Sequence, residues 1–231
     1  MKEISVVFSA HRENGLCNAR ELYKILCEIR PEIAFEEVRP SEFEHYCQHG
    51  SKYSLEAKAM ALLLQSNSVR RVPVDRFDMP QNEWSRAKQE FDDLFDYVRH
   101  VSREYQLLDE RNAWSASRYG LPYLNGDSCA AAMVRLAELE DRSVNSAANP
   151  KLADALRKWR QLNECRERSM VRQVYEHCKA SDFTVGVFLV GVAHKTGIER
   201  EIESCSVGET TRIDWKRMPW ALATRTRWSR P

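Results

Sequence analysis

The sequence has no apolar run long enough to cross a bilayer. Its longest run, residues 185–193, has the length of a strand, whereas a membrane-spanning helix needs roughly 18–20 apolar residues. A shorter run at residues 4–10 stops at His11, Arg12 and Glu13 instead of at a small-residue cleavage site. We therefore interpret it as a strand and not as a signal peptide. We expect a cytoplasmic protein with no membrane partner.

Cysteine pairs of the C-x-x-C type are also missing. The seven cysteines are odd in number and spread widely, at positions 17, 27, 47, 129, 165, 178 and 205. This spacing favours reduced thiols in a cytoplasm over a disulfide framework.

No charge of one sign prevails, because 35 Lys and Arg residues stand against 34 Asp and Glu residues, which leaves a net charge of +1. This balance argues against a globally basic nucleic-acid-binding protein and against an acidic tail protein. Glycine and proline are few, 8 of each, and 43% of the residues are hydrophobic, which excludes collagen-like, linker-like and disordered chains. The length fits one medium-sized domain, residues 1–231, with a sizeable insertion.

Three signature motifs are absent as well. The patterns G-x-G-x-x-G, G-x-x-x-x-G-K-[ST] and G-x-S-x-G do not occur, so nucleotide-binding and serine-hydrolase functions lose their strongest sequence support. There is no internal repeat of fixed period and no low-complexity segment.

What the sequence does contain is an alternation of strands and helices. Runs of β-branched and aromatic residues predict strands at residues 4–9, 33–35, 69–74 and 184–192. Apolar residues at helical spacing follow the first two strands, and successive β-α units imply parallel strands joined by helical crossovers. We therefore predict an α/β fold with a central, mostly parallel sheet and flanking helices.

A long helical insertion separates the third strand from the last core strand. One apolar stripe predicts a single helix over residues 81–110, and a second long helix is predicted from Asn149-Pro150 to residue 180. Residues 113–148 between them are expected to form shorter helices and loops. We interpret residues 79–181, approximately, as a helical cap over the sheet.

A helix at residues 195–204 and a basic tail at about 207–231 complete the chain. The tail interleaves basic residues with Trp215, Trp220 and Trp228, as a nucleic-acid-binding surface does. A terminal segment that packs back on the protein by its tryptophans explains the same pattern. We favour this second interpretation and do not expect a nucleic-acid partner.

Every predicted strand ends in ionisable residues. In chain order these are His11-Arg12-Glu13, Glu36-Glu37, Asp75-Arg76 and His194. Ligand sites in open α/β sheets lie outside the carboxyl ends of the parallel strands, so these groups could converge on one edge. Histidines together with carboxylates suit a divalent metal that activates water for attack on a carbonyl group. Polar residues are also expected where strands merely meet solvent, and the pattern alone leaves both interpretations open.

The second long helix adds two ionisable residues to this argument. Arg166 and His177 fall on the same helical stripe as the apolar residues Leu152, Leu156, Trp159, Met170 and Val174. A buried arginine needs a carboxylate or an anionic ligand, so Arg166 either pairs with an acid such as Glu37 or Asp75 or binds substrate or an oxyanion. For His177 we favour a hydrogen-bonded core residue.

A third pair of histidines, His45 and His49, has the i and i+4 spacing of a metal clip. The pair lacks the glutamate of H-E-x-x-H and lies in a polar segment, so we do not place the site there.

Five short segments stand in order along the chain: residues 9–13 (SAHRE), 30–37 (RPEIAFEE), 74–76 (VDR), 166–170 (RERSM) and 190–198 (VGVAHKTGI). Together they resemble the TraB/PrgY/GumN and Tiki-like families, which are related to the erythromycin-esterase and ChaN group. Relatives usually carry Gly-x-x-His at both ends, and here Phe8 takes the first glycine position. By position Glu37 matches the family acid, and strand alternation places it on the face of Ile33 and Phe35, opposite Glu36.

The resemblance implies a Tiki-like α/β fold and metal-dependent hydrolysis, which in Tiki proteins is peptide cleavage. Carried onto this sequence, it implies that His11, Glu37 and His194 hold a divalent ion, Mn, Co, Fe or Zn. Asp75 would orient a ligand or act as a base, Glu37 would also take part in catalysis, and Arg166 would stabilise the oxyanion.

Other members of these families are thought to bind haem or to act in plasmid pheromone control, so the fold transfers more readily than the activity. The alternative to a hydrolase acting on a small molecule or peptide is a regulatory protein that binds a small molecule, peptide or haem without turnover. The sequence leaves the substrate open, and also whether the protein forms homo-oligomers.

Overall fold

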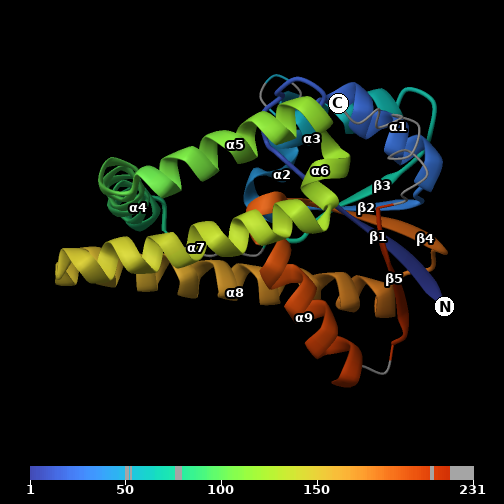
Figure 1. The fold of residues 1–231 in the computed structure, drawn as a ribbon. Coiled ribbons are helices and arrows are strands. Elements are labelled where there is room, and N and C mark those ends of the chain that lie inside the picture. The colour runs from blue at the N-terminus through green and yellow to red at the C-terminus, as the bar shows by residue number, and fades with distance from the viewer. Residues whose placement is uncertain (50–51, 53, 76–79, 209–210, 219–231) are drawn as a thin grey trace.

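The centre of the protein is a sheet of parallel strands, seen in a computed structural model that describes residues 1–49, 52, 54–75, 80–208 and 211–218. The strands are β1 (Lys2–Ser9), β2 (Ile33–Glu36), β3 (Arg70–Pro73), β4 (Val185–Gly191) and β5 (Ile213–Arg217). They lie in the order β3-β2-β4-β1-β5, and every pairing is parallel (Figure 1). The predicted α/β fold is thus confirmed, with the predicted helical insertion lying between β3 and β4.

Helices cover both faces of the sheet. Helices α1 (Ala19–Ile29) and α3 (Leu55–Leu63) pack on one face, against alternate residues such as Val7 and Val187. Helix α8 (Pro150–Ala180) and helix α9 (Lys195–Gly208) pack on the other face, which carries Phe35. Because both faces are buried, the strands are almost continuously apolar, which is the pattern of an enclosed parallel sheet.

The two central strands, β1 and β4, form the switch point of the sheet. The chain leaves β1 towards β2 through α1 on one face, and it leaves β4 towards β5 through α9 on the opposite face. Crossovers that depart in opposite directions leave a crevice at the carboxyl ends of the two strands, where α/β proteins bind ligands. His11 follows β1 and His194 follows β4, so the fold places both histidines at this crevice.

The insertion forms a helical arm that extends to one side of the sheet (Figure 1). Its helices are α4 (Gln81–Val101), α5 (Arg103–Tyr119), α6 (Leu121–Asn125), α7 (Asp127–Ala147) and α8. The first half of α8 packs with α4, α5 and α7 around Leu94, Leu136 and Leu156, whereas its second half packs on the sheet. Helix α8 therefore connects the arm rigidly to the sheet. Between β2 and α3 lie the short elements η1 (Pro40–Glu42) and α2 (Phe43–His49).

Two predictions for the insertion are wrong. The helix expected over residues 81–110 is broken at Ser102, where the backbone is extended and the hydroxyl accepts a hydrogen bond from the Tyr105 N–H, so that a new helix begins. The shorter helices expected over residues 113–148 are mostly one 21-residue helix, α7, which begins at Asp127 after Gly126. Gly120, at φ 66°, separates α5 from α6.

The C-terminal tail also differs from the prediction, because its residues Ile213–Arg217 form β5 along the edge of β1. The indole N–H of Trp215 donates to the Tyr175 hydroxyl at 3.2 Å, so this tryptophan does pack back on the protein. Trp220 and Trp228 lie outside the described residues. Within the part of the chain that is described, no helix is both long and apolar enough to span a membrane.

One carboxyl group in the arm makes the stability of the protein depend on pH. Glu140 on α7 lies 3.9 Å from Arg160, and burial raises the pKa of Glu140 from 4.5 to about 7. The folded state therefore holds this proton more tightly than the unfolded chain. The contribution of this proton to the free energy of unfolding is complete below about pH 4.5 and is lost as the pH rises through about 7.

We expect Glu140→Gln to raise the free energy of unfolding by about 1–2 kcal/mol at pH 8 and to change it little near pH 4. Urea denaturation at the two pH values measures both effects. Glu138→Gln, an exposed position on the same helix, is the control and should have little effect at either pH. An equal gain at both pH values would contradict this explanation.

Candidate functional site

The ionisable residues predicted at the strand ends do gather on one rim of the sheet. Across the rim they follow the strand order, with Asp75 after β3, Glu37 after β2, His194 after β4 and His11 after β1. A Cβ atom added to Gly191 would lie 3.2 Å from Glu37 Oε2 and also 3.2 Å from His11 Nε2. Gly191, the last residue of β4, therefore lies between Glu37 and His11, and His194 Nε2 lies 3.2 Å from the other oxygen of Glu37.

Glu37 is the centre of this cluster and its side chain is almost completely buried. Its Oε1 accepts a hydrogen bond from Arg166 at 2.7 Å and lies 3.2 Å from His194 Nε2, and its Oε2 accepts from the Gly191 N–H at 2.7 Å. Burial alone would raise the pKa of Glu37, but the hydrogen bond and charge of His194 and the charge of Arg166 lower it to about 2. Glu37 is thus ionised at neutral pH.

His194 is held from both sides by carboxylates. Its Nδ1 lies 2.9 Å from Glu167 Oε1 on α8, opposite the Nε2 that faces Glu37. Burial would lower the pKa of His194, but the hydrogen bonds to Glu167 and Glu37 raise it to about 9. Gly197 on α9 makes room for this arrangement, because a Cβ there would lie 1.8 Å from Glu167 Oε2. Only a glycine allows the Glu167 carboxylate to remain where it is.

His11 is held in the same way but is more accessible, with 64% of its side chain exposed. Its Nδ1 lies 3.4 Å from Oε1 of the buried Glu56, and the same oxygen accepts from the Ser9 hydroxyl at 2.6 Å. Glu56 lies in the first turn of α3, whose first N–H, that of Leu55, donates to the His11 carbonyl at 3.1 Å. The hydrogen bond and the charge of Glu56 raise the pKa of His11. The first turn of α3 therefore fixes both the backbone and the ring of His11.

Arg166 on α8 bridges two of the strand ends. It donates to Glu37 and, at 2.9 Å, to Asp75 Oδ2, and only 15% of its side chain is exposed. The ion pair considered from the sequence is therefore formed with both acids at once. The charges and hydrogen bonds of Asp75 and Glu37 raise the pKa of Arg166 against the effect of burial. Asp75 orients the guanidinium group, which shares Glu37 Oε1 with His194.

The cluster has an excess of negative charge. Four carboxylates with buried side chains, those of Glu37, Glu56, Asp75 and Glu167, lie around the two histidines. Arg166 contacts Glu37 and Asp75, and the exposed Arg200 lies 3.9 Å from Glu167, so the formal charge is −2 with both imidazoles neutral. The raised pKa values of His11 and His194 reflect this excess, because a proton on each ring offsets part of it. A divalent cation would offset it in the same way.

Sequence reasoning did not identify Glu56 and Glu167, the two acids behind the histidines. Glu56 follows the helix cap Ser54, so it has the sequence appearance of an ordinary acid at a helix start. Glu167 lies at about 60° from Leu152 when 100° is counted per residue, just beyond the apolar stripe. A stripe that extends to about 60° from Leu152, instead of about 40°, includes Glu167.

Other candidate residues lie away from the cluster. Glu36 faces the opposite side of the sheet from Glu37, as strand alternation predicts, and there pairs with Arg71 through two hydrogen bonds of 2.6 and 2.7 Å. His177 packs against Phe35, with ring centroids 6.1 Å apart. His45 and His49 form an exposed pair on α2 with centroids 4.8 Å apart. Arg76 lies outside the described residues.

Whether the cluster suits a metal can be tested on its donor atoms. Among the described residues, no group of three His, Cys, Asp or Glu side chains has the geometry of a formed metal site. Two of the predicted ligands nevertheless fit, because the 3.2 Å between His194 Nε2 and Glu37 Oε1 suits two atoms that each lie about 2.1 Å from one ion. His11 Nε2 lies across Gly191 from the other oxygen of Glu37, each of them 3.2 Å from the Cβ position of Gly191. The donor types and the charge also match a divalent ion.

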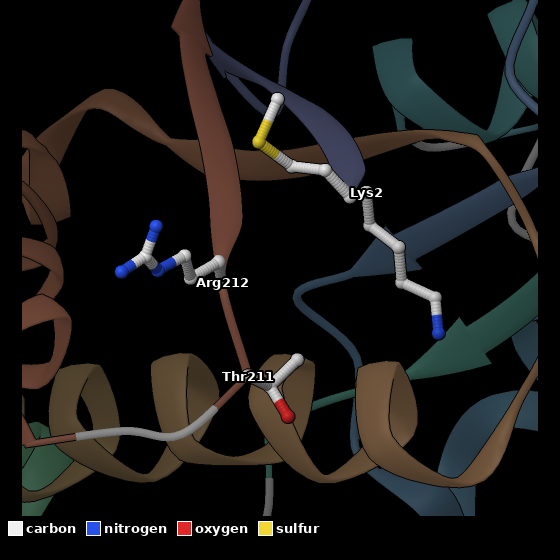
Figure 2. A pocket seen from close by; sticks show the side chains of 4 residues that line it. Lys2, Thr211 and Arg212 are labelled. Carbon is white, nitrogen blue, oxygen red and sulfur yellow. The ribbon is translucent and has the colours of Figure 1, made fainter.

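A hollow of about 540 Å³ lies at the other edge of the sheet, where β1 and β5 begin (Figure 2). It is lined by Met1, Lys2, Thr211 and Arg212. The side chains of Lys2 and Arg212 point away from each other, and Lys2 donates to the Cys178 and Ser181 carbonyls (Figure 2). Because its polar groups do not converge, we assign no ligand to this hollow.

Comparison of the chain with protein-family models, with curated proteins and with solved structures gives no match. The resemblance to the TraB/PrgY/GumN and Tiki-like families therefore stays a prediction from the five segments.

Proposed function

We propose that this protein is a metal-dependent hydrolase that cleaves a peptide or ester bond, with His11, Glu37 and His194 as ligands of a divalent ion. One observation carries the proposal: each histidine is held at Nδ1 by a buried carboxylate, Glu56 for His11 and Glu167 for His194. Metal-binding histidines are typically oriented by such a carboxylate on the nitrogen that does not bind the ion. The same His–carboxylate arrangement occurs at both histidines near Glu37, and this repetition favours a metal site over a structural cluster.

The residues of the chain have distinct tasks in this proposal. Glu56 and Glu167 keep the protons of the two histidines on Nδ1. Both Nε2 atoms are then free to coordinate an ion together with Glu37. A bound divalent ion would supply a hydroxide at neutral pH by lowering the pKa of a coordinated water. Arg166 would donate a hydrogen bond to the oxygen that becomes negative when the carbonyl is attacked, and Asp75 keeps the guanidinium group oriented. The exposed side of His11 leaves an approach for the substrate.

The first test is metal binding by the purified protein. We expect elemental analysis to find bound Mn, Co, Fe or Zn, and added Mn, Co or Zn to raise the melting temperature of the metal-free protein. His194→Ala should abolish both effects, because it removes the most buried of the three ligands.

The double variant His45→Ala/His49→Ala is the matched control, because this exposed pair could bind added metal adventitiously. The control should keep the metal content and the thermal shift of the unchanged protein. If the unchanged protein neither contains nor responds to these metals, or if the control loses the effect and His194→Ala keeps it, the proposed metal role is wrong.

The second test is turnover. The metal-loaded protein should hydrolyse members of a panel of chromogenic esters and internally quenched peptides. Arg166→Lys should lower kcat by about 10²–10³-fold if the guanidinium group stabilises the oxyanion, and should reduce the metal content much less. Metal binding without turnover on any member, or a Soret band on haem titration that His11→Ala removes, would instead support the alternative, a binding protein on the same fold.

A further inference from the structure

The corner between α6 and α7, residues 121–126, touches both strands that carry the histidines. It belongs to the helical insertion, yet α6 lies next to the end of β1 (Figure 1), and hydrogen bonds join the corner to Phe8 and Lys195. No metal ligand is located on this corner. Two of its contacts lie next to the histidines: Phe8 is three residues before His11, and Lys195 is the residue after His194.

Asn125 holds the β1 side. Its amide oxygen accepts from the Phe8 N–H at 2.9 Å, and its amide nitrogen donates to the Phe8 carbonyl at 2.8 Å and to the Leu121 carbonyl at 2.9 Å. The side chain thereby satisfies both polar groups of the Phe8 backbone, as a neighbouring strand would. Asn125 is buried, so these bonds are not shared with bulk water.

Lys195 holds the β4 side. Its ammonium group donates to the carbonyl oxygens of Gly126 at 2.8 Å and Leu124 at 3.2 Å, at the carboxyl end of α6, and only 2% of the residue is exposed. It also lies 5.5 Å from the centre of the Phe8 ring. A buried ammonium group is costly unless polar contacts replace its hydration, and here two carbonyl groups of the corner and the Phe8 ring do so. Among the described residues Lys195 forms no ion pair, and Glu199 and Asp127 act on it only by charge at longer range.

We propose that Asn125 and Lys195 are positioning residues that hold His11 and His194 at the separation needed to share one ion. This inference rests on the proposed function. Asn125 and Gly126 of the corner bind Phe8 at the end of β1 and Lys195 after β4. The distance between the two histidines therefore depends on the insertion as well as on the pairing of β1 with β4. Phe8, which takes the first glycine position of the resembling families, supplies both the backbone that Asn125 holds and the ring beside Lys195.

The test compares Lys195→Met and Asn125→Asp with Leu136→Ala, a control that destabilises the distant part of the arm. Titration with Co or Mn, at a temperature where circular dichroism shows all three variants folded, measures the metal Kd. We expect Kd to rise 10- to 100-fold in the first two variants and to stay unchanged in Leu136→Ala, although all three have a lower melting temperature. If all three variants bind metal as tightly as the unchanged protein, the corner only stabilises the fold and the inference is wrong.

A second readout separates this inference from the proposed function. In the metal-free protein, the imidazole NMR signals of His11 and His194 and the hydrogen exchange of the Phe8 amide report the geometry directly. Lys195→Met and Asn125→Asp should shift both sets of signals and accelerate exchange at Phe8, whereas Leu136→Ala should not. If the unchanged protein binds no metal but these changes occur, the proposed function fails and the positioning of the histidines stands. If they do not occur, the positioning role fails whatever the metal result.

Discussion

Replacing Arg166 by Met is expected to lower the free energy of unfolding at pH 7 by about 3–5 kcal/mol. The variant keeps an unbranched side chain but removes the guanidinium group that Glu37 and Asp75 share. Asp75 is then buried without this counter-charge and Glu37 keeps only His194, so the cost is much larger than that of a surface ion pair. Urea denaturation at pH 7 measures it.

The matched control is Arg157→Met on the same helix, where Arg157 pairs with Asp154 and 65% of the arginine side chain is exposed. That change should cost less than about 1 kcal/mol. Adding Asp75→Asn to Arg166→Met should recover part of the loss, because it removes the carboxylate that has lost its guanidinium partner. Equal costs for the two arginines would show that the cluster does not depend on Arg166 for its charge balance.

Replacing Gly197 by Ala is expected to weaken metal binding by 10- to 100-fold while the protein remains folded. The new methyl group would lie within 2.7 Å of three atoms of the Glu167 carboxyl group, which is the flexible end of its side chain and can swing away. The swing breaks the 2.9 Å contact with His194 Nδ1. Since alanine favours helices over glycine by about 1 kcal/mol, the loss of binding should not come with a loss of the fold.

This effect depends entirely on Glu167, which gives a sharp control. In a Glu167→Ala background the methyl group of Gly197→Ala meets no carboxylate, so the second substitution should change the metal Kd no further. NMR titration of the metal-free single variant should also show that the pKa of His194 has fallen from its value of about 9, because one of the two carboxylates that raise it has moved. A further tenfold loss in the double variant would mean that Gly197 acts through another group.

The pattern of the sequence was sufficient for four of the five strands described in the sheet. The β-branched and aromatic runs at residues 4–9, 33–35 and 184–192 predicted β1, β2 and β4, which are the three strands at its centre. The strand β5 was missed because Ile213–Arg217 alternates polar and apolar residues within a basic segment, as expected of an edge strand that packs on one side only. The break at Ser102 was missed because the apolar stripe continues across it. The Ser102 hydroxyl caps a new helix, and such a cap interrupts a helix without changing the spacing of the apolar residues.

The sequence by itself determined which ionisable residues stand at the strand ends, because parallel strands present all their carboxyl ends at one edge. It also placed Arg166 on the buried side of α8, where one guanidinium group meets Glu37 and Asp75. Only the tertiary structure decided that Glu56 and Glu167 stand behind His11 and His194, and that Asn125 and Lys195 tie the two strands to the insertion. Those contacts join segments up to 117 residues apart, and no local pattern records them, because the partners are brought together only when the helices pack on the sheet.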